Sequence, residues 1–595
     1  LFASRTMLRP MKHLTQLVIS TLLCVTSVAS SHSIEGIWTG EIQASSGATQ
    51  VIMHITSTGP TTWTGSVDTP SQDSYGIPLS HVSFSDSTLT VMCDVTNAIW
   101  VAKLDSKTDE LRGEWTQRGM SLPLTCTHTP SPPPMPTTLA GQLIGTWEGM
   151  LNVGVVQLRL VLHLERNSPT TIAGYMISPD QSPEEIPIGR IDWTTSRALN
   201  ILLGGIGSTF DVSLSDANNV LTGTFSQGGA TFDISLKRVE VASIIKRPQT
   251  PQPPFPYDSI EVTYQNAAND ITFAGTLTTP RSSGPFPAVL MITGSGGQDR
   301  NEEIFQHKPF WVIADALTRR GIAVLRIDDR GVGGTSTQLG QATNPSTATT
   351  FDFANDVEAG VAFLSARDEI GKIGLIGHSE GGVIAPLVAA RDNRVAFIVL
   401  LAGTGVRGDR LLVSQNRLLM QAMGADDEAI ESSRRMHRAL WDVVLDESLT
   451  ADESVVHIRS IIESDPEFAA APEDERAAGM KQALSQLTSP WIRAFARYDP
   501  APTLSKVSCP VLAINGEVDL QVPYKANLDA IAAALKKGNN NDYTIRAFPG
   551  LNHLFQHSES GLVSEYGQIE ETISQEVLDF IADWISVRFL PQHGQ

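Results

Sequence analysis

The chain has 595 residues and a formal net charge of -21, with 43 Lys and Arg against 64 Asp and Glu. This charge argues against nucleic acids and anionic membranes as partners, because both bind clusters of basic side chains. One hydrophobic core does not fill a chain of this length, so we expect several domains of about 150 residues each.

The N-terminal segment at 1–30 is typical of a secretory signal peptide. Arg9 and Lys12 precede an apolar stretch at 14–25, and the small residues at 28–30 suit a signal peptidase. The apolar stretch is shorter than the roughly 20 residues of a membrane-spanning helix, and an uncleaved anchor is the alternative. We therefore expect a secreted or periplasmic bacterial protein with no stable membrane span.

A repeat follows this segment. Gly-Ile-Trp-Thr-Gly at 36–40 matches Gly-Thr-Trp-Glu-Gly at 145–149, a shift of 109 positions. The same shift aligns 69–72 with 178–181. Several matches in one register indicate two sequential copies of one module.

Each copy is predicted to be an antiparallel β-barrel or sandwich, lipocalin-like in outline. Apolar residues alternate along its strands, as where Leu89, Val91, Cys93 and Val95 share one face. Proline-rich segments end each copy and are expected to be stiff, extended linkers. The predicted boundaries are 31–129 for the first module, 130–142 for its linker, 143–240 for the second module and 241–257 for the second linker.

The turns that both copies share contain proline and glutamine. Such turns could bind a glycan or a cell-wall polymer. Common turn chemistry in duplicated modules explains the same residues without any ligand, and we prefer this structural explanation. A role in anchoring or presenting a substrate is therefore a hypothesis.

Two cysteines lie at apolar positions of the first copy. Cys93 aligns with Leu202 and Cys126 with Leu236, so both are expected to face the core. In a secreted chain this pair could form a disulfide, and two buried thiols are the alternative. Cys509 is expected to be a free core thiol. No spacing of Cys and His is typical of a zinc site, and we expect no metal and no cofactor.

From 258 to 595 the pattern changes to strands that alternate with helices. Unbroken apolar runs, such as the one at 288–292, are separated by helical segments and indicate a parallel sheet covered on both faces. Between about 405 and 500 the apolar residues have helical spacing, which predicts a helical cap inserted in the sheet. The sheet is expected to resume at 511–514.

A Gly-His-Ser-Glu-Gly motif at 377–381 follows an apolar strand and precedes a stretch with helical spacing. A serine at a strand-to-helix turn has strained backbone, so its neighbours must have almost no side chain. Gly377 and Gly381 meet that need. The placement predicts Ser379 as a nucleophile on an elbow, whereas the motif alone also allows a glycine-rich turn.

A serine nucleophile needs a base, and the base needs an anion that fixes its tautomer. In a sheet of this kind the acid and then the histidine follow the serine, each in a loop after a late strand. Asp519 and His553 follow two such predicted strands and are the candidates. Their rivals are Glu517 for the acid, and His557 and His307 for the base.

The loop at 293–300 follows the predicted strand at 288–292 and has the sequence Thr-Gly-Ser-Gly-Gly-Gln-Asp-Arg. Its glycines let the backbone approach a developing negative charge. One oxyanion-hole N–H is expected from Ser295 and the other from Glu380, next to the nucleophile. A phosphate-binding loop is excluded because no Lys-Ser or Lys-Thr follows. Asp-Asp-Arg-Gly at 328–331 is expected to be a structural loop.

The region contains four motifs: Gly-Ser-Gly-Gly-Gln-Asp-Arg at 294–300, Asp-Asp-Arg-Gly-Val-Gly-Gly at 328–334, Gly-His-Ser-Glu-Gly-Gly at 377–382 and Leu-Asn-His-Leu-Phe-Gln at 551–556. Together they resemble the bacterial EstD-like carboxylesterases of the α/β-hydrolase superfamily. The resemblance covers about 258–590. It implies an α/β-hydrolase fold with a Ser379, Asp519 and His553 triad and activity on carboxylic esters with short to medium acyl chains. Family members have one N-terminal β module or a different one, so the tandem pair departs from the pattern.

The sequence therefore predicts a serine carboxylesterase that acts on a small-molecule ester through an acyl-enzyme on Ser379. A serine peptidase of the prolyl-oligopeptidase or aminopeptidase kind and an acyl thioesterase use the same triad, because leaving-group contacts set the preference. A non-enzymatic alternative is an envelope binding protein with an inactive hydrolase fold. The complete set of serine, acid and histidine in the expected order argues against that alternative.

Overall fold

The computed structural model describes residues 34–591 except 45–46, 60, 70–73, 118, 130–134, 154–155, 169–170, 194–196, 204–205, 229, 243–245, 267, 269 and 338–347. The predicted signal peptide at 1–30 lies outside the described residues. The chain forms two compact units: the first comprises Leu1–Gln72 and Ile77–Pro133, and the second comprises Asp73–Gly76 and Pro134–Gln595. Each unit is described by itself below.

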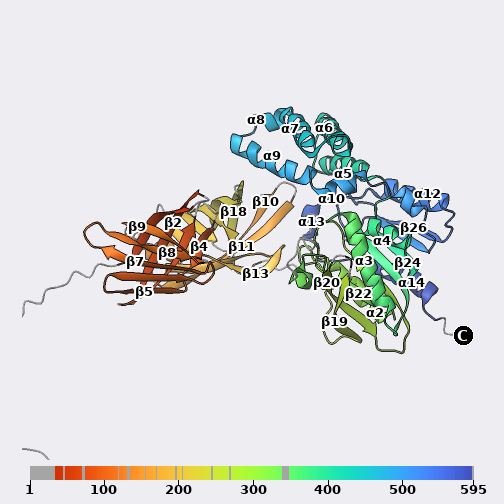
Figure 1. Cartoon of the computed structure of the whole chain (residues 1–595), viewed down its shortest axis with the longest axis horizontal. Helices are drawn as coiled ribbons and strands as arrows, with labels where there is room; N and C mark the ends of the chain where they lie inside the picture. Colours follow the sequence, from red (N-terminus) through yellow and green to blue (C-terminus); the bar gives the residue numbers. More distant parts are fainter. Residues whose placement is uncertain are drawn as a thin grey trace, which may run out of the picture. The chain divides into compact units, whose positions relative to one another are not determined.

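The first unit is a curled antiparallel sheet, a half-barrel (Figure 1). Its strands are β1 (Gly36–Ala44), β2 (Gly47–Gly59), β3 (Thr62–Thr69), β4 (Ser74–Pro78), β5 (His81–Ser85), β6 (Thr88–Cys93), β7 (Ala98–Asp105), β8 (Glu110–Gln117) and β9 (Met120–Thr129). They pair in the order β4-β3-β2-β1-β9-β8-β7-β6-β5. The turn between β4 and β5 bridges β3 and β6, because Leu79 N–H donates to the Gly65 carbonyl (2.9 Å) and Ser80 N–H to the Met92 carbonyl (2.8 Å).

The predicted alternation is seen on β6, with one exception. Leu89, Val91 and Cys93 are buried, and the residues between them are partly exposed. The strand ends at Cys93, so Val95 lies in the following turn, where its side chain is 73% exposed. The prediction for Val95 is therefore wrong because the period of two applies only within a strand.

The second unit begins with a second half-barrel. Its strands are β10 (Gly145–Val153), β11 (Val156–Ser168), β12 (Thr171–Ser178), β13 (Ser182–Pro187), β14 (Arg190–Trp193), β15 (Ala198–Leu203), β16 (Ser208–Leu214), β17 (Val220–Gln227) and β18 (Ala230–Val239). The order β13-β12-β11-β10-β18-β17-β16-β15-β14 repeats that of the first sheet. The bridging turn recurs too, with bonds from Ile188 N–H to the Gly174 carbonyl (2.9 Å) and from Gly189 N–H to the Leu202 carbonyl (2.8 Å).

Helix α1 (Thr137–Leu143) precedes the second sheet, where the sequence predicts an extended linker. Leu139, Ala140 and Leu143 form one apolar side of this helix and pack into the core of the second sheet. The prolines before this helix led to the prediction of an extended linker. They end at Pro136, directly before the helix, and no proline lies inside it, so the helix can form.

The two cysteines of the first unit are free thiols. Cys93 lies on β6 and Cys126 on β9, and β7 and β8 run between these strands in the sheet. A disulfide needs Cα atoms about 4.4–6.8 Å apart, which this order does not provide. The disulfide hypothesis is therefore wrong and the alternative of two buried thiols is correct. Burial raises the pKa of the Cys126 thiol to about 12. Cys509 is also a free thiol, as predicted.

The rest of the second unit is built on an eight-stranded, mostly parallel sheet. Its strands are β19 (Tyr257–Asn266), β20 (Ile271–Pro280), β21 (Phe286–Ile292), β22 (Ala323–Ile327), β23 (Ile370–His378), β24 (Val395–Leu401), β25 (Val511–Gly516) and β26 (Tyr543–Phe548). They pair in the order β19-β20-β22-β21-β23-β24-β25-β26. Only β19, β20 and β22 pair in antiparallel fashion. The predicted α/β fold class is confirmed.

Helices cover both faces of this sheet (Figure 1). They are α2 (Pro309–Arg319), the 3-10 helix η3 (Gly333–Thr337), α3 (Thr350–Ser365), α4 (Gly381–Ala389), α11 (Ala501–Leu504), α12 (Tyr524–Lys537), α13 (Val563–Tyr566) and α14 (Gln575–Phe589). One hydrophobic core lies between the sheet and α3, α4 and α12, and another lies between the sheet and α2 and α14.

A group of helices interrupts the sheet between β24 and β25, as the predicted cap does (Figure 1). They are α5 (Gly408–Ala422), α6 (Asp427–Leu445), α7 (Ala451–Glu463), α8 (Pro466–Ala470), α9 (Glu473–Leu487) and α10 (Pro490–Arg497). Trp441, Ile458 and Ile492 belong to a small core of their own. No helix in the described part of the chain combines the length and the hydrophobicity that a membrane crossing requires.

Candidate active site

Ser379 lies on the turn between β23 and α4. The strand ends at His378 and the helix begins at Gly381, and the φ of the serine is 53°, in the left-handed region. Its N–H donates to the Leu401 carbonyl (2.8 Å), and its carbonyl accepts from Gly382 N–H (2.9 Å). These bonds hold a conformation that costs about 1–3 kcal/mol.

Both elbow positions require glycine for steric reasons. A Cβ atom at Gly377 would lie 2.0 Å from the carbonyl oxygen of Gly381, and a Cβ atom at Gly381 would lie 2.2 Å from that of Ile292. Such contacts are far inside van der Waals distance. The strand, the turn and the helix can therefore approach this closely only without side chains at 377 and 381.

Asp519 and His553 form a buried pair. The loop after β25 carries the aspartate and the loop after β26 carries the histidine, and Nδ1 of His553 lies 2.8 Å from Oδ2 of Asp519. The other carboxylate oxygen accepts from the N–H groups of Gln521 and Val522, both at 2.8 Å. Three donors thus hold an anion that fixes the orientation of the imidazole.

The rival residues are placed elsewhere. Glu517 is exposed, and His557 has a side chain that is 69% exposed and pairs with Glu571. His307 is fully buried and donates from Nε2 to the Tyr566 carbonyl (2.9 Å). Burial lowers the pKa of His307 to about 4, so this histidine is neutral at pH 7.

The predicted oxyanion loop lies beside the serine. A Cβ atom at Gly294 would be 3.3 Å from Cβ of Ser379, which places the following residue, Ser295, next to the nucleophile. Ser295 and Ser379 both line one cavity, and Glu380 directly follows the nucleophile. The two residues expected to supply the N–H groups of the oxyanion hole are therefore both adjacent to Ser379: Glu380 in the sequence and Ser295 in space.

The Asp-Asp-Arg-Gly segment after β22 anchors this loop. Oδ2 of the Asp329 carboxyl group accepts from Oγ1 of Thr293 (2.8 Å) and from the N–H of Gln298 (3.0 Å). Burial, with nearby Glu302 and Asp356, raises the pKa of Asp329 to about 8. The segment has the structural role that the sequence predicts, and it holds the oxyanion loop in particular.

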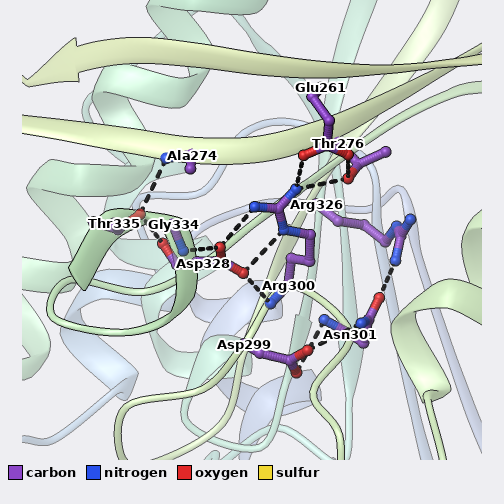
Figure 2. Close-up of polar contacts among 10 residues, drawn as sticks. All are labelled: Glu261, Ala274, Thr276, Asp299, Arg300, Asn301, Arg326, Asp328, Gly334 and Thr335. Atoms are coloured by element: carbon purple, nitrogen blue, oxygen red, sulfur yellow. Dashed lines mark hydrogen bonds and ion pairs between the residues drawn. The ribbon is translucent and has the colours of Figure 1, made fainter. Parts of the chain in front are cut away.

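Arg300 completes this anchor (Figure 2). Its guanidinium bonds the Asp328 carboxylate through Nε (3.0 Å) and Nη2 (2.7 Å), and its N–H bonds the same carboxylate at 2.9 Å. It also contacts Glu261 and Oγ1 of Thr276 on the first two strands of the sheet. Burial alone would raise the pKa of Asp328, but the bonds from Arg300 hold it below its usual value. A bidentate arginine thus fixes one end of the oxyanion loop.

A second histidine and acid pair lies beneath the nucleophile. Nδ1 of His378 lies 3.0 Å from Oε1 of Glu302, and the same oxygen accepts from the N–H of Gly294 at 2.7 Å. Nε2 of His378 donates to the carbonyl of His553 at 3.1 Å. Burial alone would lower the pKa of His378. The charge and hydrogen bond of Glu302, the bond to the His553 carbonyl and the charge of Asp519 together outweigh burial, so the pKa is raised. This pair connects the oxyanion loop with the loop of the candidate base.

The Glu380 side chain connects the elbow with the cap. Its carboxylate accepts from Nε1 of Trp491 on α10 (2.9 Å) and from Oγ1 of Thr350 at the start of α3 (2.6 Å). Burial raises the pKa of Glu380, although these bonds and one from Ser295 act in the opposite direction. The side chain next to the nucleophile therefore holds the cap against the oxyanion loop.

One cavity of about 280 Å³ joins these parts. Ser379 and His553 line it, together with apolar residues from the cap and the loops: Ile304, Leu411, Leu412, Trp491, Phe495, Val522 and Leu554. Among its described lining residues Glu302 is the single carboxylate, and it is bonded to His378. The volume is near the lower end of the range of about 300–1,000 Å³ for small-molecule sites.

The sequence did not point to Glu302, Trp491 or Tyr566, all of which line the cavity. They lie outside the four motifs, in segments whose residue types are ordinary for a loop or a helix. Only the fold brings them next to Ser379. Within the described part of the chain, no cluster of His, Cys, Asp and Glu is arranged to hold a metal ion.

Comparisons with known proteins find similarities to the C-terminal half of the chain. The family model described as serine aminopeptidase S33 matches residues 309–559. Esterase EstD of Thermotoga maritima is 25% identical over 312 residues, which cover 52% of this chain. The chain covers 65% of the length of that relative.

The solved structures that match part of this chain include an esterase of Pyrococcus furiosus, at 15% identity and a TM-score of 0.34, over 57% of this chain and 92% of that one. They also include the proline iminopeptidase of Mycobacterium smegmatis, at 15% identity and a TM-score of 0.33, over 55% and 98% of the two chains. The C-terminal half of this chain has an α/β-hydrolase fold and is distantly similar to Esterase EstD, and two curled antiparallel β-sheets precede it.

Proposed function

We propose that the protein is a serine carboxylesterase for esters with short to medium acyl chains. The observation that carries this proposal is the buried Asp519 and His553 pair at the wall of the cavity that contains Ser379 on its elbow. A nucleophile, an oriented base and N–H groups beside the reacting carbon are the parts that acyl transfer needs.

In the proposed reaction, Oγ of Ser379 attacks the ester carbonyl carbon while His553 takes the hydroxyl proton. The N–H groups of Ser295 and Glu380 bind the oxyanion of the tetrahedral intermediate. The C–O bond to the alcohol then breaks, and His553 returns the proton to the leaving alkoxide. Asp519 stabilises the imidazolium of His553 that exists between these two proton transfers. Water, activated by His553, attacks the acyl-enzyme and releases the acid.

The cavity lining favours an uncharged ester over a substrate with a free amino terminus. An aminopeptidase must hold the ammonium group of its substrate, and a buried ammonium needs a carboxylate partner. The carboxylate of Glu302 already accepts from Gly294 N–H and contacts His378. The apolar side chains from the cap suit an acyl chain instead.

A substrate panel tests the proposal. We expect the purified protein to hydrolyse nitrophenyl acetate and nitrophenyl butyrate faster than aminoacyl anilides or acyl thioesters. Ser379→Ala should lower kcat by roughly 10⁵-fold or more. Faster turnover of anilides or thioesters by the wild-type protein would contradict the choice of an ester.

Secretion or export to the periplasm is part of the proposal and has its own test. We expect expression in a bacterium to yield a mature protein that begins shortly after residue 30, detected by N-terminal sequencing of the periplasmic or medium fraction. Recovery of the full-length chain in the cytoplasm alone would contradict it.

A further inference from the structure

Two segments of the hydrolase domain outside the cap helices contribute to the wall of the cavity. The first is the wall loop, defined here as 302–307, which contributes Glu302 and Ile304. The second is α13 with the residues up to 573, which contributes Tyr566. The two segments contact each other, since His307 bonds the Tyr566 carbonyl and Oγ1 of Thr572, both at 2.9 Å.

The wall loop has strained backbone. Glu302, Phe305 and Gln306 have φ values of 51°, 49° and 62°, although none of them is glycine. Left-handed residues other than glycine persist only where the surrounding structure holds them. The wall loop carries Glu302, the partner of His378, and thus depends on outside support.

Arg247, in the linker after the second β sheet, supplies that support. Its guanidinium donates to the Phe305 carbonyl through Nε (3.2 Å) and Nη2 (2.9 Å). It also donates to the carbonyls of Gly567 (2.8 Å) and Ile569 (2.9 Å). One side chain therefore connects the wall loop to the segment after α13.

Gln249 binds the same segment from the same linker. Its side-chain carbonyl accepts from Thr572 N–H (2.6 Å) and Ile573 N–H (3.1 Å), and its amide donates to the Ile573 carbonyl (2.7 Å). The sequence predicts this linker to be a stiff spacer, but Arg247 and Gln249 fasten it to the hydrolase domain. We call these two residues the linker clamp.

The second β sheet also contacts this wall. Strand β11 contacts α13, and a Cβ atom at Gly567 would lie 3.3 Å from Cβ of Asp180. Asp180 is 2% exposed and accepts from the N–H and the guanidinium of Arg159, both at 2.7 Å. A buried ion pair of the sheet therefore lies directly against the residue that follows Tyr566.

We infer that the linker clamp and the Asp180 contact are positioning elements of the active site, an inference that rests on the proposed esterase function. They hold Ile304, Glu302 and Tyr566 in place around the acyl group. The second β sheet is thus a part of the catalytic unit rather than a separate binding module.

The test uses the full-length chain with Arg247→Ala, Arg247→Lys and the control Arg238→Ala. Arg238 also donates to several carbonyls, those of Gln142, Ile144 and Asn218, but all of them lie within or beside the second sheet. Steady-state kinetics on nitrophenyl acetate and nitrophenyl octanoate give kcat and KM for each variant. Hydrogen exchange reports the protection of amides in 302–307 and 566–573.

We expect Arg247→Ala to lower kcat/KM at least tenfold for the octanoate, with a smaller loss for the acetate, because the wall contacts the longer acyl chain. Arg247→Lys should recover part of the loss, and Arg238→Ala should keep wild-type constants even if it melts earlier. Exchange should rise in both wall segments only in Arg247→Ala.

Wild-type kinetics and wild-type protection in Arg247→Ala would overturn the inference, as would equal losses in Arg238→Ala. If the wild-type protein hydrolyses neither ester, the proposed function fails. The exchange measurement then still decides whether the clamp holds the wall.

Discussion

The two β sheets of this protein share one topology but differ where the second meets the hydrolase domain. Trp38 Nε1 donates to the Ile34 carbonyl, and Trp147 Nε1 donates to the Leu143 carbonyl, both at 2.8 Å. The buried pair Arg159 and Asp180, in contrast, corresponds to Gln50 and Ser71 in the first copy, at the same shift of 109 positions.

This difference teaches that duplicated modules can diverge in role while the fold stays constant. The shared residues lie in the cores, where burial and hydrogen bonding restrict change. The residues that differ lie on the surface that contacts α13 in the second copy. Except for 73–76, the first copy belongs to a compact unit of its own.

Deletion of each copy in turn should have the largest effect and tests whether the two β sheets differ in their importance for catalysis. Removal of 34–133 should leave kcat/KM within about twofold, because all of this segment except 73–76 belongs to the first compact unit. Replacement of 135–242 by a flexible linker should lower kcat/KM roughly 100-fold, since small misplacements of a site cost about that much. Ester hydrolysis by the purified proteins is the measurement. Equal losses would show that the two copies do not differ in role.

A matched pair of substitutions, one in each copy, tests the same difference at single residues. Asp180→Asn replaces the carboxylate that faces the buried Arg159 guanidinium by a neutral amide. It should lower kcat/KM about fivefold to tenfold. Asp68→Asn breaks a comparable pair with His54 in the first copy and should leave the kinetic constants unchanged. Thermal unfolding of both variants controls for loss of fold. A kinetic loss in Asp68→Asn as large as that in Asp180→Asn would contradict the account.

The two units should also respond differently to pH. The Asp329 carboxyl has its pKa raised from 3.8 to about 8, so the native state keeps a proton that the unfolded chain loses. Asp329 should therefore make the free energy of unfolding of the second unit fall as pH rises from about 4 to 8, and it contributes at most about 1.4 kcal/mol per pH unit to that slope. Asp329→Asn should make this slope shallower in the second unit alone, as followed by calorimetry. Part of the slope should remain below pH 6, because burial raises the pKa of Asp356 to about 6. An unchanged slope in the variant would rule out Asp329 as its source.

The smallest expected effect concerns the feature that both copies share. Trp38→Phe and Trp147→Phe each remove one buried indole hydrogen bond and leave a carbonyl without its donor. Each should lower the free energy of unfolding of its own unit by about 1–3 kcal/mol. Chemical denaturation measures both losses. A large difference between them would indicate that the two cores are not equivalent.

Much of the fold could be predicted because its signals are local. The repeat, the parallel strands and the elbow each depend on residues within a short window, and the predicted loops of Asp519 and His553 meet as their strand order requires. Val95 and α1 were predicted wrongly because strand ends and short helices depend on where neighbouring elements stop.

The support of the site could not be predicted in the same way. Arg247 and Gly567 are 320 positions apart, and Glu302 and His378 are 76 positions apart. No periodicity connects such residues, and an arginine in a proline-rich linker has the composition of an exposed spacer. Only the folded chain shows that its donors meet backbone carbonyls of the wall.

Covalent labelling tests whether His553 activates Ser379 as a nucleophile. A fluorophosphonate reacts only with a serine that a neighbouring base activates. We predict that the full-length protein takes up one equivalent, that peptide mass spectrometry places it on Ser379, and that His553→Ala slows labelling by at least 100-fold. Ester hydrolysis by a protein that carries no label on Ser379, or equal labelling of the His553→Ala variant, would contradict the account.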